Sequence, residues 1–238
     1  DRVDTGANLG ATVHYRQGDS DEDRTAYGEV VLAAIGRVPN TDADWFRSSG
    51  LKLDERGYVT VDGYGRTNLD GVWALGDITP GHALAHRAFE QGITIAEKIA
   101  GADPKPVIDD TVPQVVFSFP EAASVGLTLD QAKAREDVVE PKETAYPMLS
   151  NARMLMSGEG GSMTVVSGAF ANNPDMQVVL GVHIVSPIAS DLIAEAEQLV
   201  GNRVPLAGAA RLIHPHPTFS ETLGEALLKA DGRPLHTR

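Results

Sequence analysis

The sequence predicts an α+β domain over residues 111–238, preceded by shorter pieces that do not form complete domains. Two apolar strands separated by a turn sequence, residues 163–169 and 176–184, predict an antiparallel hairpin. Segments whose apolar residues recur at helical spacing follow the hairpin, and strands followed by helices are typical of the α+β class. Upstream, single strands run into glycine turns without a full set of neighbouring strands.

The first 41 residues predict two strands and a linker. Residues 12–16 alternate in character, which predicts a half-exposed strand, and the acidic stretch at residues 19–24 predicts a solvated hairpin loop. The apolar run at residues 28–36 enters a glycine turn and predicts a buried strand. Residues 37–41 then break the pattern with an X-Pro step and an Asn, which indicates a linker between domains.

Residues 42–110 predict short strands and one long helix. Apolar residues recur at helical spacing from residue 83 to residue 100, and Gly101 follows as a C-terminal stop. The other elements expected are a turn at residues 54–57, a strand at 58–61, a short apolar strand that ends abruptly in Gly76-Asp77, and a polar connector at residues 102–110.

Beyond the connector, the pattern predicts strands and capped helices. Thr128 and Gln131 have the spacing of a capping box, which predicts a short helix there. The turn sequence at residues 172–175 joins the two strands of the hairpin. The remaining elements expected are a strand at residues 113–119, a helix capped by Ser190-Asp191 that runs to about Val200, and helices at residues 206–212 and 219–230.

Composition limits the classes of function. The chain has 238 residues, a formal charge of −13 and a pI near 4.9, so a nucleic-acid or anionic-membrane partner is not expected. No apolar run approaches the roughly 20 residues of a bilayer span. The absence of cysteine excludes disulfides, thiolate metal sites and a thiol nucleophile within this chain. We expect a soluble, cytoplasmic protein and, because residue 1 is Asp rather than Met, part of a longer polypeptide.

The segment from Ile213 to Glu221 carries the strongest chemical signal. It places His216 between prolines with Glu221 five residues further on, and an imidazole beside a carboxylate is suited to proton transfer near neutral pH. A structural reading is open as well, since Thr218 and Glu221 have capping-box spacing before an apolar helix. His214 and His216 would need a third ligand to form a metal site, and no residue of a suitable type is near them in the sequence. A structural role is therefore the better interpretation of His214.

The Gly76-Asp77 step is a second candidate site. A carboxylate on a glycine turn at the end of a strand is placed for a ligand at the sheet edge, where open α/β folds bind cofactors. The helix expected from residue 83 would direct its positive end toward an anionic group. On spacing alone, a structural turn aspartate is about equally well supported. His86, His183 and the methionines at positions 148, 154 and 156 are expected to have structural roles.

Several motifs together resemble the pyridine nucleotide-disulfide oxidoreductases. The stretch from Thr67 to Asp77 is similar to the second flavin-binding signature of that family, T-x4-hydrophobic-aromatic-A-hydrophobic-G-D. Within the family, the double His-Pro form is most similar to the dihydrolipoamide dehydrogenases. The other matching blocks, in chain order, are residues 33–40, 84–86, 112–121, 125–128 and 214–218.

The resemblance implies three parts: residues 1–41 as the end of a nicotinamide nucleotide-binding domain, 42–110 as the C-terminal part of an FAD-binding domain, and 111–238 as an interface (dimerisation) domain with an antiparallel sheet and helices. It implies that Asp77 binds a ribityl hydroxyl of FAD and that Gly76 belongs to the same cofactor site. The backbone at Leu84, Ala85 and His86 would approach the flavin ring.

The resemblance also implies the roles of the terminal pair. His216, oriented by Glu221, would be the acid/base toward a dithiol or disulfide substrate. The thiols that it serves would belong to the second subunit of a homodimer, and the His216–Pro217 bond is expected to be cis.

The departures from the family pattern define the alternatives. The redox cysteine pair and both G-x-G-x-x-G nucleotide loops are absent from this sequence. We therefore expect this chain alone to be inactive, to lack disulfide chemistry and to retain neither FAD nor NAD(P). It would be the C-terminal half of an FAD-dependent, NAD(P)-linked dithiol oxidoreductase, or a non-catalytic dimerisation fragment. If the longer protein lacks the cysteine pair, a flavin-dependent quinone or metal-ion reductase is the better hypothesis.

Overall fold

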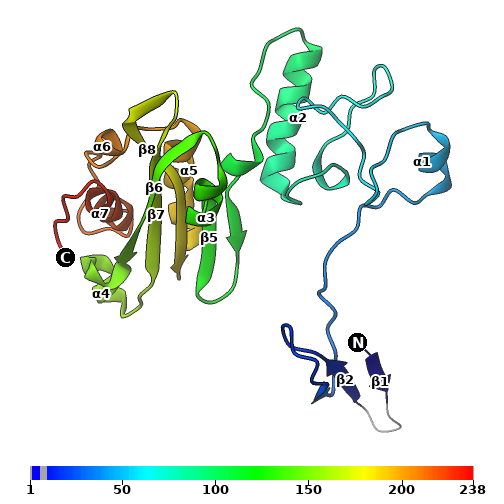
Figure 1. The fold of residues 1–238 in the computed structure, drawn as a ribbon, viewed down its shortest axis with the longest axis horizontal. Coiled ribbons are helices and arrows are strands. Elements are labelled where there is room, and N and C mark those ends of the chain that lie inside the picture. Colours follow the sequence, from blue (N-terminus) through cyan, green and yellow to red (C-terminus); the bar gives the residue numbers. More distant parts are fainter. Residues whose placement is uncertain (1, 6–9, 238) are drawn as a thin grey trace. The chain divides into compact units, whose positions relative to one another are not determined.

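The computed structural model describes residues 2–5 and 10–237, and Figure 1 traces their elements in chain order. The chain divides into two compact units, residues 1–39 and 40–238. The strands are β1 (Arg2–Thr5), β2 (Ala11–Tyr15), β3 (Arg24–Gly28), β4 (Gln114–Val116), β5 (Glu121–Gly126), β6 (Val138–Pro147), β7 (Ser162–Phe170) and β8 (Asn173–Ser186). The helices are α1 (Asp44–Ser48), α2 (Ala85–Ile99), α3 (Leu129–Ala134), α4 (Ala152–Ser157), α5 (Ala189–Gly201), α6 (Leu206–Ala209) and α7 (Glu221–Ala230).

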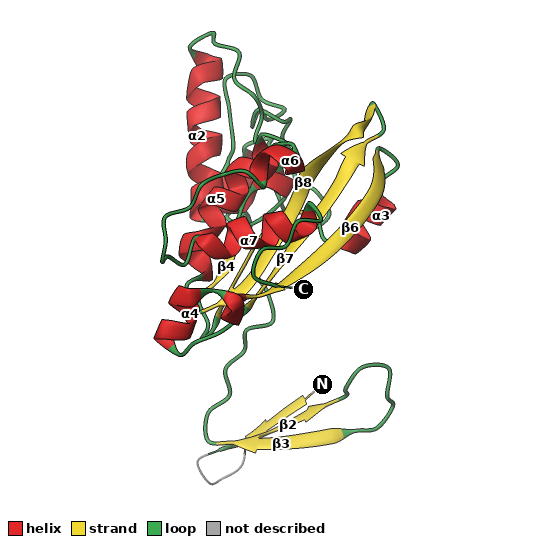
Figure 2. Cartoon of the chain, turned by 90° about the vertical axis from the view of Figure 1, so that its left-hand side faces the viewer, coloured by secondary structure: helices red, strands yellow, loops and turns green. Residues whose placement is uncertain are grey.

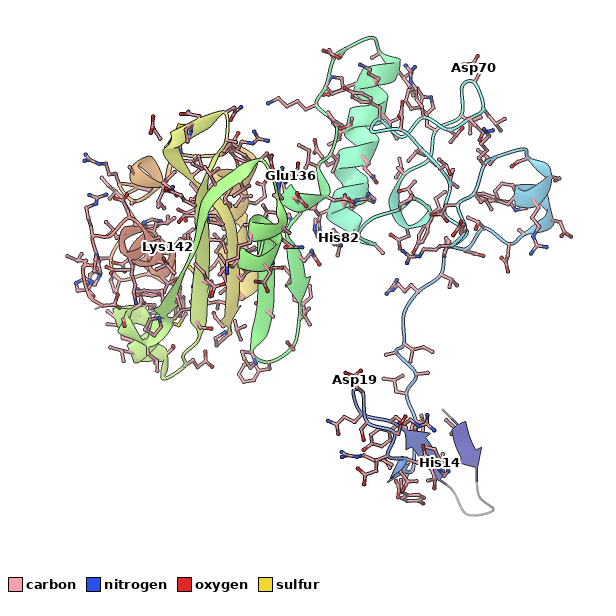
Figure 3. All side chains as sticks on the ribbon, in the orientation of Figure 1. His14, Asp19, Asp70, His82, Glu136 and Lys142 are labelled. Atoms are coloured by element: carbon pink, nitrogen blue, oxygen red, sulfur yellow. The ribbon has the colours of Figure 1, made fainter. Side chains whose placement is uncertain are left out.

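The first unit contains a three-stranded antiparallel sheet in the order β1-β2-β3. The half-exposed strand predicted at residues 12–16 is confirmed as β2, whose residues 11–14 are half-buried. Asp19 lies in the exposed loop that joins β2 and β3 (Figure 3), so the predicted solvated hairpin loop is confirmed.

The buried strand predicted at residues 28–36 is wrong. Strand β3 ends at Gly28, and residues 29–39 belong to no strand. Val30, Leu32 and Ile35 are 86%, 88% and 100% exposed. An apolar run becomes a buried strand only where other elements cover both of its faces, and the described part of this unit offers no sheet beyond β1-β2-β3.

The strands predicted at residues 58–61 and before Gly76 are also wrong. They are reduced to two isolated bridges, Leu53 with Val59 and Arg66 with Trp73. The reason is local. Single carboxylate oxygens of Asp54 and Asp62 each accept two backbone N–H groups at 2.9 Å, which turns the chain back before a ladder can extend. A small core of Phe46, Val59 and Ala74 holds these turns together.

Helix α2 confirms the long helix predicted from residue 83. It ends at Ile99, and Gly101 adopts a φ of +85°, a left-handed conformation that glycine accommodates at a helix end. No helix in the described part of the chain is long and apolar enough to cross a membrane.

The second unit contains a five-stranded antiparallel sheet in the order β4-β5-β8-β7-β6. The predicted hairpin is confirmed as β7 and β8, but its turn lies earlier than expected. Phe170 pairs with Asn173, so the turn consists of Ala171 and Asn172 alone, while Pro174 and Asp175 already belong to β8. A two-residue loop suffices for a hairpin, and the pairing therefore extends into the predicted turn.

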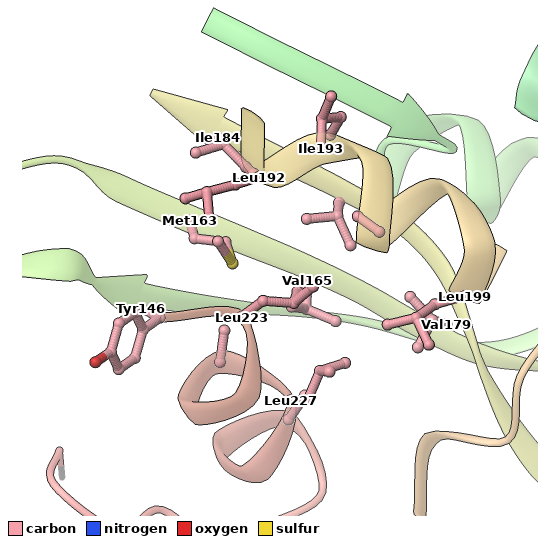
Figure 4. Close-up of a cluster of buried hydrophobic side chains, with 14 of the residues drawn as sticks. Tyr146, Met163, Val165, Val179, Ile184, Leu192, Ile193, Leu199, Leu223 and Leu227 are labelled. Carbon is pink, nitrogen blue, oxygen red and sulfur yellow. The ribbon is translucent and has the colours of Figure 1, made fainter. Parts of the chain in front are cut away.

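The two faces of this sheet bury different helices (Figure 2). Side chains alternate along a strand, so Val165 and Val179 pack with α5 and α7 while their neighbours Val166 and Val178 pack with α3. The larger cluster lies on the α5 and α7 side and includes Leu223 and Leu227 of α7 (Figure 4). Each such residue, buried at 0–1% exposure, contributes about 1.5–3 kcal/mol of hydrophobic stabilisation.

Helix starts differ from the prediction in one informative way. The capping box of Thr128 and Gln131 is confirmed at α3. At α5, however, Ser190 lies inside the first turn, and the N-cap Ile188 has no side-chain bond. The carboxylate of Glu121 accepts the Ser190 N–H at 2.8 Å instead, so a residue from β5 caps this helix. Helices α6 and α7 are shorter than predicted, over residues 206–209 and 221–230.

Candidate active site

The terminal His-Pro segment brings an imidazole and a carboxylate together. His216 Nδ1 lies 2.9 Å from Glu221 Oε1. The His216 side chain is 70% exposed and that of Glu221 only 21%. With Nδ1 bonded to a carboxylate, the neutral ring carries its proton on Nδ1 and leaves Nε2 free to accept one. The pair can therefore take a proton from a group that approaches from solvent and stabilise the resulting imidazolium.

The predicted capping box of Thr218 and Glu221 is wrong in one half. Glu221 Oε2 accepts the Thr218 N–H at 2.8 Å, as such a box requires. Helix α7 nevertheless begins at Glu221 with Ser220 as its N-cap, and the Thr218 hydroxyl donates to the Pro215 carbonyl at 2.6 Å. Because one carboxylate oxygen binds the backbone and the other binds His216, Glu221 fixes the ring relative to its own loop.

The surroundings of Glu221 keep it ionised. Burial by itself raises the pKa of this carboxyl, but the hydrogen bonds from the Thr218 N–H and from His216 outweigh it and hold the pKa below 4.5. A folded-state pKa below the unfolded value stabilises the fold above about pH 4.5, and this contribution is lost as the pH falls through the folded pKa.

We therefore expect the stability difference between the wild type and Glu221→Gln to be pH-dependent. The wild type should be more stable at pH 7, and the difference should shrink toward pH 4, because only the wild type binds a proton at this position. Urea unfolding at each pH measures the free energy of unfolding of both proteins. The contributions of the other carboxylates cancel in the difference, because both proteins contain them. A difference that stays constant from pH 7 to pH 4 would contradict the assigned hydrogen bonds.

The loop that carries His216 has a second anchor, which the sequence did not reveal. Asn151 is buried, its Oδ1 accepts the backbone N–H groups of Arg153 and Met154 at the start of α4, and its Nδ2 donates to the Thr218 carbonyl at 3.2 Å. An Asn before a helix is a recognisable capping signal. Its contact 67 residues away is not readable from sequence. The His216–Pro217 bond is cis, as expected.

His214 does not join His216 in a metal site. Its Nε2 lies 2.8 Å from Glu195 Oε1 of α5, and its side chain is only 9% exposed. The hydrogen bond to Glu195 raises the pKa of His214 despite the opposing effect of burial. No group of three or more potential ligands occurs among residues 2–5 and 10–237. The bond to Glu195 therefore supports a structural role for His214.

The second candidate site lies where residues 76–78 form a 3₁₀ turn. Gly76 has a φ of +71°, and a Cβ there would lie 3.3 Å from the Ala88 Cβ of α2. The Gly76 N–H donates to Gln91 Oε1 at 2.9 Å, a support that the sequence did not reveal. Asp77 is exposed. Glycine thus allows the turn to pack on α2 while Asp77 faces outward.

Helix α2 begins beside this turn without a side-chain cap. Leu84 is the N-cap, and Ala85 and His86 form the first turn, where backbone N–H groups lack helical acceptors. The His86 ring binds the Pro113 carbonyl at 2.7 Å rather than capping the helix. An outward carboxylate beside an uncapped helix start has the donor and acceptor set that a polyhydroxyl chain and an electron-rich ring require, so these residues fit a flavin.

The other residues considered from sequence have structural surroundings. Met148 and Met154 are buried at 0% and 1% exposure, as expected of core residues, whereas Met156 is 67% exposed. His183 binds the Leu127 carbonyl at 3.1 Å between β8 and the chain after β5.

Comparison with protein families finds two matches. A model described as "Pyridine nucleotide-disulphide oxidoreductase, dimerisation domain" matches residues 112–227. A second, described as "Pyridine nucleotide-disulphide oxidoreductase", matches residues 3–92.

Individual proteins show the same similarity. The chain is 40% identical over 236 residues to a dihydrolipoyl dehydrogenase of Cupriavidus necator, covering 98% of this chain and 48% of the relative. It is 38% identical over 229 residues to a dihydrolipoyl dehydrogenase of Geobacillus stearothermophilus, covering 95% and 46%. The crystal structure of LpdA from Mycobacterium tuberculosis superimposes with a TM-score of 0.81 at 30% identity, over 96% of this chain and 47% of that one. The chain thus spans about half the length of the curated relatives that it matches.

Proposed function

The chain belongs to the pyridine nucleotide-disulphide oxidoreductase family, and on this premise we propose that it forms the C-terminal half of a dithiol-disulfide oxidoreductase of the dihydrolipoyl dehydrogenase type. The observation that carries the proposal is the His216–Glu221 pair, which leaves one ring nitrogen free and exposed. The similarity to dihydrolipoyl dehydrogenases supports a dithiol as the substrate.

His216 acts as the acid/base in this proposal. In the forward direction its Nε2 accepts the proton of a substrate thiol, and the thiolate becomes the nucleophile for exchange with a disulfide supplied by the longer protein. Glu221 holds the tautomer and stabilises the imidazolium. In the reverse direction the same nitrogen returns the proton to the departing thiolate. A neutral thiol with a pKa near 8.5 and an imidazole near 6.5 are close enough for transfer both ways.

The residues at the second site would hold FAD in the longer enzyme. Asp77 would accept hydrogen bonds from ribityl hydroxyls, Gly76 would keep the turn against α2, and the backbone at Leu84, Ala85 and His86 would face the electron-rich edge of the ring. When bound, FAD supplies two-electron transfer between the dithiol and NAD(P). The domain boundaries proposed for this arrangement are residues 1–41, 42–110 and 111–238.

The proposal includes a homodimer. The match over residues 112–227 is to a dimerisation domain, and domains of this kind pair by twofold symmetry. His216 lies on an exposed loop in a chain that contains no cysteine, so the disulfide that exchanges with the substrate thiol comes from elsewhere in the assembly. In the proposal this disulfide belongs to the second subunit.

The test uses the longer enzyme, purified with FAD. Sedimentation should give a dimer, and dihydrolipoamide should reduce NAD⁺ or NADP⁺ at a rate that saturates with the dithiol. A monomer, or a dimer that oxidises NADH only with quinones or metal ions as acceptors, would contradict the dithiol function. The latter result would favour a flavin-dependent quinone or metal-ion reductase.

A further inference from the structure

The His214 ring is enclosed between two helices of the core. On one side, Glu195 of α5 binds its Nε2 at 2.8 Å. On the other side it lies against α7 at Gly224, where an added Cβ would come within 2.6 Å of the His214 Nδ1. Gly224 is buried in the interior of α7, where glycine is less favourable than alanine. This glycine makes room for the ring.

The enclosed ring is connected to the candidate acid/base by a very short segment. Only Pro215 separates His214 from His216, and the Pro215 carbonyl accepts the Thr218 hydroxyl at 2.6 Å. His216 itself is 70% exposed, and its ring binds the side chain of Glu221. An exposed ring on a loop keeps its direction only if the backbone beneath it is held. Two residues before His216, the His214 side chain connects this backbone to α5 of the core.

Two carboxylates face His214. Glu195 binds it from α5, and Glu221 of α7 interacts with it electrostatically at longer range. A protonated His214 in turn favours the ionised form of Glu221. The same side chain therefore anchors the loop and supports the charge of the carboxylate that orients His216.

We propose that His214, through its bond to Glu195, is a positioning residue that sets the orientation and tautomer of His216. The catalytic meaning of this role rests on the function proposed above, but the orientation itself is measurable without turnover. His214 touches neither substrate nor reacting atoms and acts through the backbone and Glu221.

The experiment compares three variants of the 238-residue chain. His214→Phe keeps a ring between α5 and α7 but removes the bond to Glu195, while His214→Gln keeps a donor that can reach Glu195. His183→Gln is the matched control, because His183 is another partly buried histidine with a single backbone partner. Imidazole ¹⁵N chemical shifts of the seven histidines report the tautomer of His216.

In the wild type, His216 should be the Nδ1–H tautomer when neutral. We expect His214→Phe to mix the two tautomers of His216, His214→Gln to restore most of the wild-type signal, and His183→Gln to change nothing. An unchanged His216 in a folded His214→Phe chain would overturn the inference, even if that chain unfolds at a lower temperature, since lost stability alone shows only a structural role.

In the longer enzyme, the same variants distinguish the positioning role of His214 from the proposed dithiol oxidation. His214→Phe should lower kcat for dithiol oxidation about tenfold, which corresponds to about 1.4 kcal/mol, and should shift its pH profile with little change in KM. If the wild-type enzyme oxidises no dithiol, the proposed function fails, but the spectra of His216 still decide the positioning role.

Discussion

Replacement of His216 by Ala in the longer enzyme should lower dithiol-dependent turnover by about 10²–10⁴-fold, the usual contribution of a general acid/base. Reduction of the flavin by NADH should stay close to the wild-type rate, because no thiol proton moves in that half reaction. The reason is structural: the exposed Nε2 of a ring fixed by Glu221 is the candidate proton acceptor. Stopped-flow absorbance of the flavin, with NADH and with dihydrolipoamide in separate experiments, measures both half reactions.

The control for this prediction is His183→Ala, which removes a histidine of the same domain from a purely structural position. It should leave both half reactions unchanged in a folded enzyme. If His216→Ala slows both half reactions equally, the proton role is wrong and the variant has damaged the assembly instead.

Substitution of Gly181 by Ala should destabilise the second unit by about 1–3 kcal/mol or more, the range for overpacked cores. Gly181 of β8 pairs with Gly126 of β5, and an added Cβ would lie 2.2 Å from the Leu127 carbonyl oxygen. The added Cβ would meet backbone atoms of Leu127, which cannot rotate away as a side chain does. Chemical unfolding followed by circular dichroism measures the change.

Gly208→Ala is the matched substitution. Gly208 lies in α6, and an added Cβ there would meet nothing within 4 Å. Alanine also favours helix, so a gain of up to about 1 kcal/mol is expected. If both substitutions destabilised the protein equally, the tight packing of Gly181 against the backbone of Leu127 would not be the cause of the effect at Gly181.

The parts of the fold that sequence predicts well are those whose signals are local. The capping box at Thr128, the stop at Gly101 and the helical spacing before it lie within single elements, and the structure confirms them. The strand expected at residues 28–36 depended on neighbours that would bury it, and its side chains are exposed. The strand expected at residues 58–61 failed because turns formed by Asp54 and Asp62 end the pairing after one bridge.

In the candidate site, too, contacts between residues close in sequence could be predicted and contacts between distant residues could not. His216 and Glu221 are five residues apart, so their hydrogen bond could be anticipated from spacing. Their supports come from distant positions: Asn151 reaches Thr218 over 67 residues, and Glu195 reaches His214 over 19. Such contacts arise from the packing of α4 and α5 around the loop, which no short motif encodes.

The position of Glu221 at the first turn of α7 links reactivity to the interior. Two and six residues further along the same helix, Leu223 and Leu227 are almost completely buried in the largest hydrophobic cluster. A short helix moves as a rigid body. A core substitution that shifts α7 would therefore displace the Glu221 carboxylate as well. Screens that select variants for activity would therefore recover substitutions in this core that never touch a substrate, and directed evolution of such an enzyme would tune proton transfer through packing.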